Sequence, residues 1–211
     1  HDLLEEIEKN DISDDLDQLM HVAQESASNL LDLVESMLDI GKLQKREMTI
    51  NSAPHSIKDI AETAYTALLA SFRQANIEMV YDIPDYVGDA FIDEALIRRV
   101  FVNLVQNAIK FTPVDGEIRV TARLSGERNN MMEIMVSDTG PGIPKEHRQR
   151  IFSEFTTIDD KSQKQQRGPR GQGLGLTFCK LAVEAHGGNI WIADEGPLPG
   201  ATFVLTLPIA T

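Results

Sequence analysis

The sequence predicts an α+β protein, in which a helical N-terminal segment precedes a domain of strands and helices. Apolar residues near the N-terminus recur at helical spacing, whereas two segments between residues 116 and 137 alternate apolar and polar residues as antiparallel strands do. A chain of 211 residues, 42% of them hydrophobic, can form one well-buried domain and a smaller appendage. We therefore expect two parts, residues 1–47 and residues 48–211.

Charge and cysteine content exclude several classes of partner. A net charge of -13 makes nucleic acid and anionic lipid unfavourable partners, because both are negatively charged. The single cysteine, Cys179, excludes an internal disulfide and suits a reducing cytoplasm. No apolar run is long enough to span a membrane. We expect a cytoplasmic chain without direct membrane contact, and any anchor of a longer protein would lie upstream of His1.

The acidic segment 1–47 is predicted to form a helix, a break and then a long helix. Its apolar residues follow a heptad-like seam at Leu16, Met20, Ala23, Ala27, Leu30, Val34, Met37 and Gly41. A second apolar face consists of Leu31, Leu33, Leu38 and Ile40. One neighbouring helix cannot cover both faces, so we expect a multi-helix bundle that a second copy of the chain completes. This segment is therefore predicted to form a homodimer.

The next elements lead to an informative helix. Pro54 marks a boundary, and Ser56 with Asp59 is predicted to cap a helix that runs to about residue 75. Short strands are expected at residues 77–83 and 90–92, followed by a helix over residues 94–110.

Asn103, Asn107 and Lys110 fall on one face of that helix. A solvated face is the simpler interpretation, but asparagine is a mediocre helix former, so two of them one turn apart need another reason. An amide oxygen is a suitable ligand for Mg²⁺, and a lysine ammonium is suitable for phosphate.

Two segments of the sequence are rich in glycine: one follows a predicted strand, and the other begins a predicted helix. Asp138 ends the strand 132–137 and precedes Gly140 and Gly142, a pattern typical of a tight turn or of a site where a carboxylate accepts a hydrogen bond from an adenine amine. Residues 171–176 open a helix that runs to about His186, and the free amides of such a helix start can bind phosphate.

The remaining segments complete the domain. Residues 156–170 contain few apolar side chains and are predicted to form a mobile loop or lid. Closing strands are expected at residues 189–193 and 201–208, with Trp191 in the core.

Four segments, in this order, resemble the N, G1, F and G2 boxes of sensor histidine kinases: residues 103–111, residues 138–142, Phe152 with Phe155, and residues 171–176. The resemblance implies a Bergerat-type α/β sandwich, a mixed sheet with helices on one face, with ATP lying under the lid. It implies that residues 48–211 are the ATP-binding catalytic domain and that residues 39–43 end the dimerisation helix.

The resemblance also implies roles for individual residues. The residues that it assigns to ATP binding are Asn103, Asn107, Lys110, Phe111, Asp138, Gly140, Gly142, Ile143, Phe152, Phe155, Gly171, Gly173, Leu174, Gly175 and Leu176. Asn107 would hold Mg²⁺, and Asp138 would bind the adenine amine. The residues that it assigns to catalysis are Asn103, Lys110, Arg167 and Arg170, with one of the two arginines reaching the γ-phosphate from the lid.

The implied activity is transfer of the γ-phosphoryl group of Mg-ATP to a histidine, and then to an aspartate of a response regulator. ATP-hydrolysing relatives such as gyrase resemble one another in a glutamate four residues before the metal-binding asparagine. This chain has Asn103 there, and an amide cannot act as a general base, which favours the kinase. The alternatives are an ATP-hydrolysing protein of the same fold and a non-enzymatic nucleotide-binding dimer.

No histidine of the chain matches the acceptor motif that the resemblance implies, His-Glu/Asp-Leu-Arg-Thr-Pro-Leu. His1, Asp2 and Leu3 match the first three positions of this motif, but the following residues lack the Arg, Thr and Pro. The distance along the chain from His1 to Leu43, at the end of the dimerisation helix, is also too short by several helical turns for the family. We expect the acceptor upstream of His1, so the chain should bind ATP without phosphorylating itself.

Overall fold

The computed structural model describes residues 2–126, 130–156 and 173–210 and divides the chain into two compact units, His1–Leu38 and Asp39–Thr211. The second unit thus begins with the last turns of the N-terminal helix. The predicted domain boundary between residues 47 and 48 stays a prediction.

The first unit consists of residues from helix α1 (Asp2–Gln44). The expected break in this segment is wrong, because the helix is continuous. The segment has neither proline nor glycine before Gly41. Without these residues the helix continues through the polar residues near its start. Five described side chains of the predicted seam are 42–61% exposed in the single chain: Leu16, Met20, Leu30, Val34 and Met37. Pairing with a second copy stays a prediction.

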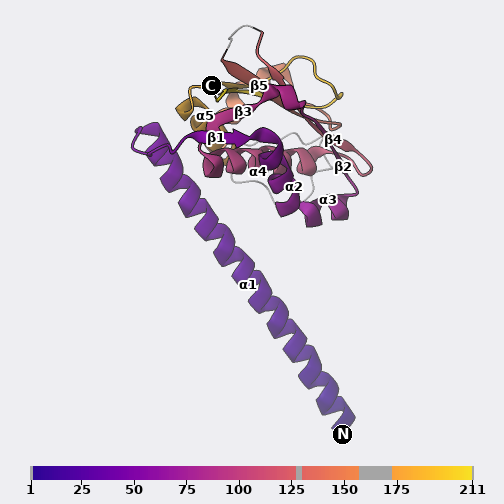
Figure 1. Cartoon of the computed structure of the whole chain (residues 1–211). Coiled ribbons are helices and arrows are strands. Elements are labelled where there is room, and N and C mark those ends of the chain that lie inside the picture. Colours follow the sequence, from indigo (N-terminus) through magenta and orange to yellow (C-terminus); the bar gives the residue numbers. More distant parts are fainter. Residues whose placement is uncertain (1, 127–129, 157–172, 211) are drawn as a thin grey trace. The chain divides into compact units, whose positions relative to one another are not determined.

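The second unit is built on a five-stranded mixed sheet (Figure 1). Its strands, in spatial order, are β2 (Glu78–Asp82), β4 (Glu117–Leu124), β5 (Met131–Asp138), β7 (Thr202–Pro208) and β6 (Ile190–Ile192). β2 pairs with β4 in parallel, and the other pairs are antiparallel. Alternate residues of β4 and β5 are buried, as their sequence pattern predicts.

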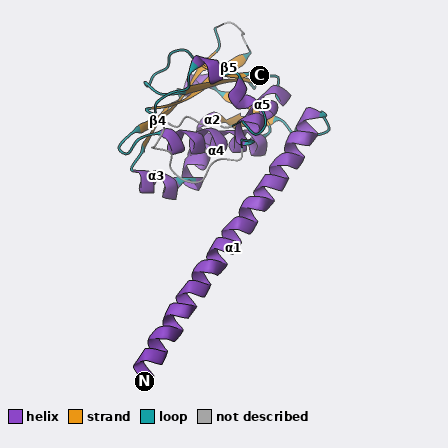
Figure 2. Ribbon diagram, turned by 180° about the vertical axis from the view of Figure 1, so that it is seen from behind, coloured by secondary structure: helices purple, strands orange, loops and turns teal. Residues whose placement is uncertain are grey.

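Helices pack against this sheet, and Figure 2 shows α2, α3 and α4 together on one side of the strands. The helices are α2 (Ile57–Ala67), α3 (Leu69–Ala75), α4 (Glu94–Phe111) and α5 (Gly175–Ala185). Among the described residues, short 3-10 turns occur at η1 (Asp85–Val87), η2 (Lys145–His147) and η3 (Arg150–Phe152). Seven residues of α4 are buried, more than in α2 or α5. The predicted α+β class is confirmed, with α4 at the centre of the helical layer.

One local prediction between residues 53 and 75 is wrong, and one strand there was not predicted. Residues 53–56 form a strand, β1 (Ala53–Ser56), which pairs antiparallel with β3 (Asp89–Ile92). The expected single helix is divided at Leu68 into α2 and α3. The predicted cap is confirmed, because the Ser56 side chain accepts a hydrogen bond from the Asp59 amide at 3.2 Å.

A buried histidine connects the end of α5 with the start of α4. His186 Nε2 accepts a hydrogen bond from the Asp93 amide at 2.9 Å, while its Nδ1 lies 2.7 Å from the Ala182 carbonyl oxygen. With Nε2 as the acceptor, Nδ1 is the ring nitrogen that donates to the Ala182 carbonyl oxygen. The Asp93 carboxylate also caps α4 by accepting from the Leu96 amide at 3.2 Å.

Trp191 is not a core residue. It lies on β6, an edge strand of the sheet, and its side chain is 38% exposed.

None of the helices in the described residues is long and apolar enough to cross a membrane.

Candidate nucleotide-binding site

Helix α4 carries the amide and lysine side chains that the sequence singled out. Asn103, Asn107 and Lys110 are each partly buried, while Leu104 and Ala108 between them are in the core. Lys110 Nζ lies 5.5 Å from the centroid of the Phe111 ring, and burial lowers the pKa of the ammonium. These polar groups thus lie at the border between core and solvent, where a ligand can reach them.

The carboxylate of Asp138 is buried at the end of β5, with the residue only 3% exposed. Oδ1 accepts hydrogen bonds from the Gly140 amide at 2.8 Å and the Ala201 amide at 3.1 Å. Burial raises the pKa of this carboxyl group, and the two hydrogen bonds oppose the shift. Such a fixed, dehydrated acceptor can select a ligand that donates a hydrogen bond.

The turn after Asp138 meets the end of α4. A Cβ atom at Gly140 would lie 2.8 Å from both Asp138 Oδ1 and the Phe111 carbonyl oxygen. Gly142 has a φ of +75°, which favours glycine. The structure therefore brings together two segments predicted to bind ATP, residues 103–111 and residues 138–142.

The first turn of α5 lies beside the same helix. Asn103 Nδ2 donates to the Gly175 carbonyl oxygen at 3.5 Å, at the limit for such a bond. No side chain caps the N-terminus of α5, so its first amides are suited to an anion. The hydroxyl oxygen of Thr177, also in this turn, is buried and has no hydrogen-bond partner among the described residues.

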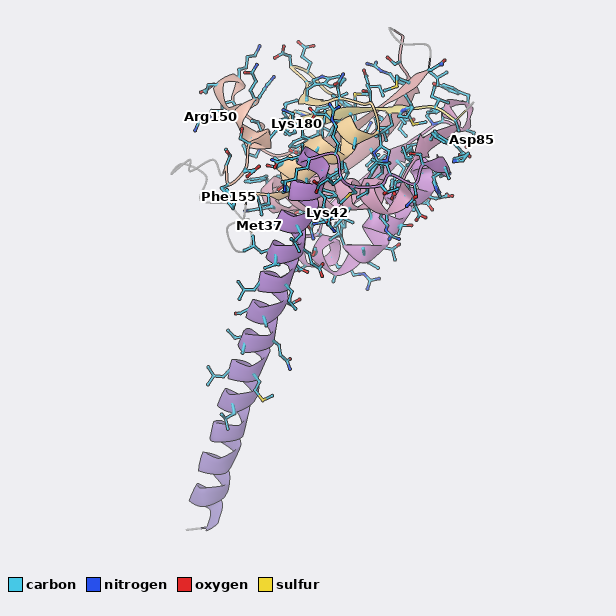
Figure 3. The ribbon with its side chains drawn as sticks, turned by 90° about the vertical axis from the view of Figure 1, so that its left-hand side faces the viewer. Met37, Lys42, Asp85, Arg150, Phe155 and Lys180 are labelled. Atoms are coloured by element: carbon cyan, nitrogen blue, oxygen red, sulfur yellow. The ribbon has the colours of Figure 1, made fainter. Side chains whose placement is uncertain are left out.

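The two predicted phenylalanines differ in burial, and Figure 3 labels Phe155, the exposed one. Phe152 is 9% exposed and packs edge-on against Phe203 of β7, with ring centroids 6.4 Å apart. Phe155 is 59% exposed and has a φ of +54°. A Cβ atom at Gly173 would lie 2.7 Å from the Phe155 carbonyl carbon, so the backbones of these two residues are in close contact.

Ion pairs hold the segment that contains Ile143. Arg148 Nε donates to the Ile143 carbonyl oxygen at 3.0 Å, and its Nη1 donates to Asp194 at 2.8 Å. Lys145 lies 2.9 Å from the same carboxylate. A hydrogen bond and the charge of Lys145, with a further contribution from Arg148, hold the pKa of Asp194 below its usual value. Through Lys145 and Arg148, the segment after Asp138 therefore contacts Asp194 in the loop that follows β6.

The remaining predicted residues divide into two groups. Leu174 is a core residue, 3% exposed, whereas Leu176 is partly buried in the first turn of α5. Arg167, Arg170 and Gly171 lie outside the described residues, as does nearly all of the predicted lid.

Two residues of this site, Gly200 and Ala201, were not predicted from the sequence. The Gly200 amide donates to the Asp138 carbonyl oxygen at 2.9 Å, and the Asp138 amide donates to the Ala201 carbonyl oxygen at 3.0 Å. Both residues immediately precede β7. The sequence does show a glycine, Gly200, just before the predicted strand 201–208. That pattern alone does not identify Asp138, far away in the sequence, as its hydrogen-bond partner.

The site combines a buried strand-end carboxylate, a polar face of α4 and an uncapped, glycine-started helix, and these groups are suited to a nucleotide. Comparison with known proteins agrees, since residues 92–211 match the family described as "Histidine kinase-, DNA gyrase B-, and HSP90-like ATPase". The chain belongs to this family. The predicted resemblance to the ATP-binding domain of sensor histidine kinases, with its Bergerat fold, is confirmed.

Individual relatives are similar to most of the chain. The adaptive-response sensory kinase SasA of Synechocystis sp. is 33% identical over 192 residues, which are 91% of this chain and 48% of that protein. Full-length ShkA, solved with AMPPNP, is 28% identical with a TM-score of 0.74, covering 89% of this chain and 37% of that one. The nucleotide-free catalytic domain of histidine kinase ThkA is 28% identical with a TM-score of 0.62, covering 75% and 95%. The chain spans about half the length of SasA.

Replacing Gly200 with alanine should destabilise the fold around Asp138. The added Cβ would lie 2.2 Å from Asp138 Oδ1 and 2.6 Å from the Gly140 amide nitrogen, so the turn must move. We expect a loss of about 1–3 kcal/mol in the free energy of unfolding, measured with urea. Gly126→Ala is the control, because a Cβ there has no neighbour within 4 Å. Equal stability of the two variants would contradict this account of the turn.

Proposed function

We propose that this chain is the ATP-binding part, with a dimerisation helix, of a sensor histidine kinase. The whole protein would transfer the γ-phosphoryl group of Mg-ATP to a histidine and then to an aspartate of a response regulator. Histidine kinase ThkA has been solved in complex with the response regulator protein TrrA, which supports this class of partner. We further propose a cytoplasmic homodimer formed through residues 1–47.

The observation that carries the proposal is the amide at position 103. Hydrolysis of ATP needs a base for the attacking water, and Asn103 supplies none. Its amide instead donates to the Gly175 carbonyl oxygen. With a neutral amide there, the activity that fits best is transfer to a nucleophile brought by another part of the kinase, for which positioning and charge neutralisation suffice.

The residues present fit Mg-ATP. Mg²⁺ usually takes one or two protein oxygen atoms in addition to phosphates and water, and Asn107 offers one such oxygen. The described residues contain no group of three or more His, Cys, Asp or Glu that could hold a metal by itself, which agrees with a metal that arrives with the nucleotide. Asp138 would accept a hydrogen bond from the adenine amine, and Lys110 and the first amides of α5 would bind phosphate.

Phosphotransfer to a supplied acceptor tests the proposal. The chain is incubated with radiolabelled Mg-ATP and a separate histidine kinase dimerisation domain that contains an acceptor histidine. We expect acid-labile, base-stable label on that domain, and none when the acceptor histidine is replaced. Release of inorganic phosphate without label would favour an ATP-hydrolysing protein, and nucleotide binding without either product would favour a non-enzymatic dimer.

Asn107→Ala should weaken binding of Mg-ATP without unfolding the protein. Loss of an oxygen ligand to a charged centre should cost about 1.5–3 kcal/mol, or about tenfold or more in affinity, as measured by calorimetry. The neighbouring Gln106 is exposed, so Gln106→Ala serves as the matched control. Parent-like affinity of Asn107→Ala would exclude this residue as the metal ligand.

Adenine recognition by Asp138 should depend on pH. The ionised carboxylate accepts the adenine amine, and burial raises the pKa of this group. As pH falls through that raised pKa the carboxyl group gains a proton, so affinity for ADP should fall at a higher pH than for an ordinary aspartate. Asp138→Asn should bind ADP more weakly and lose this part of the pH dependence, whereas the exposed Asp82→Asn should keep it. Equal affinity of the parent for ADP and GDP would exclude the role.

A further inference from the structure

An ion pair joins the C-terminal end of α1 to α4. Within the unit that begins at Asp39, Arg99 Nη1 donates to Asp39 Oδ2 at 2.5 Å. The two side chains are 33% and 28% exposed, whereas the neighbouring pair of Arg98 and Glu94 is 47% and 49% exposed and 3.7 Å apart. The first pair is closer and better shielded from water, so its charges interact more strongly.

The end of α1 is fixed within this unit. Ile40 is 4% exposed and Leu43 is 7% exposed, so both belong to its core. Gln44 Nε2 donates to Glu154 Oε1 at 2.5 Å, which places the end of α1 beside the segment that leads to Phe155 (Figure 3). Asp39 therefore contacts Arg99 from a part of α1 whose position is fixed by the burial of Ile40 and Leu43 and by the hydrogen bond of Gln44.

The same guanidinium group contacts the other helix of the site. The Cζ atom of Arg99 lies 4.1 Å from the centroid of the Phe178 ring, in the first turns of α5. A guanidinium group at this distance is attracted by the face of the ring. Asp39 thus orients the cation on which Phe178 packs.

Two further contacts set the position of α5 along α4. Asn103 donates to the Gly175 carbonyl oxygen, and the Cys179 thiol donates to the Val100 carbonyl oxygen at 3.7 Å. Asn107 lies one turn beyond Asn103 on the same helix. A shift of α5 against α4 would therefore change the distance between Asn107 and the amides that start α5.

We propose that Asp39 and Arg99 form a positioning pair for the nucleotide site. Through Phe178, the end of α1 holds the glycine-started helix at the distance from Asn107 that Mg-ATP requires. This inference rests on the proposed function, because it assigns the first turn of α5 and Asn107 to the same nucleotide. By linkage, bound nucleotide should in turn strengthen the hold on the end of α1.

Nucleotide affinity is the first measurement. Asp39→Asn and Arg99→Gln should each bind Mg-ATP about threefold to tenfold more weakly by calorimetry, and the double variant no more weakly than Arg99→Gln alone. Asp39→Glu keeps the charge and should recover most of the affinity, which a purely steric role of Asp39 would not allow. The controls are Asp32→Asn, exposed on the same helix, and Arg98→Gln, and both should bind as the parent does.

Reactivity of Cys179 is a second measurement, which is made first without nucleotide and then with Mg-ATP. This thiol is the only one in the chain, and burial raises its pKa to about 12, so it reacts only when the contact between α4 and α5 opens. Asp39→Asn should be modified by a thiol reagent severalfold faster than Asp32→Asn, with Mg-ATP slowing the reaction in both.

The outcomes separate this inference from the proposed function. A parent chain that does not bind Mg-ATP overturns both. A parent that binds, with Asp39→Asn and Asp32→Asn equal in affinity, overturns the positioning role alone. Faster modification of Cys179 at unchanged affinity also overturns it, because the ion pair would then only stabilise the fold. Urea unfolding of each variant shows that the measured chains are folded.

Discussion

The burial of the Asp138 carboxylate constrains the rest of the site. Removing this group from water is unfavourable, and hydrogen bonds from the Gly140 and Ala201 amides offset the cost. Both amides can approach only because Gly140 and Gly200 have no Cβ atom at positions where one would clash. The same turn contacts the carbonyl oxygen of Phe111. One buried carboxylate therefore determines where β5, β7 and the end of α4 meet.

Helix α4 is the element on which the other parts of the site are positioned. Its start is capped by Asp93, whose amide is held by His186, and its end touches the turn at Gly140. Between these points, Asn103 contacts the start of α5 and Arg99 contacts the end of α1. Substitution of the α4 side chains that contact α5 or the end of α1 should therefore affect nucleotide affinity even where they touch no ligand atom.

Two departures from the sequence-based expectations have a common physical cause. Ala53 is in a strand because it pairs with Ile92, and Trp191 is exposed because β6 is at the edge of the sheet. Neither fact is present in the local sequence. Local signals succeeded where the interaction is itself local, as with the Ser56 cap or the alternation of β4 and β5. The wrongly predicted break in residues 1–47 has another explanation, because the segment has no proline or glycine before Gly41 and α1 continues through its polar residues.

The sequence by itself determined the fold class and the polar face of α4, because helical periodicity alone brings Asn103, Asn107 and Lys110 to one side. It also determined the family, through motifs whose order is written in the chain. Only the tertiary structure decided that the Ala201 amide binds the Asp138 carboxylate and that the Asp39 carboxylate meets Arg99. Those partners are 63 and 60 residues away, and folding of the sheet and packing of the helices bring them within hydrogen-bond distance.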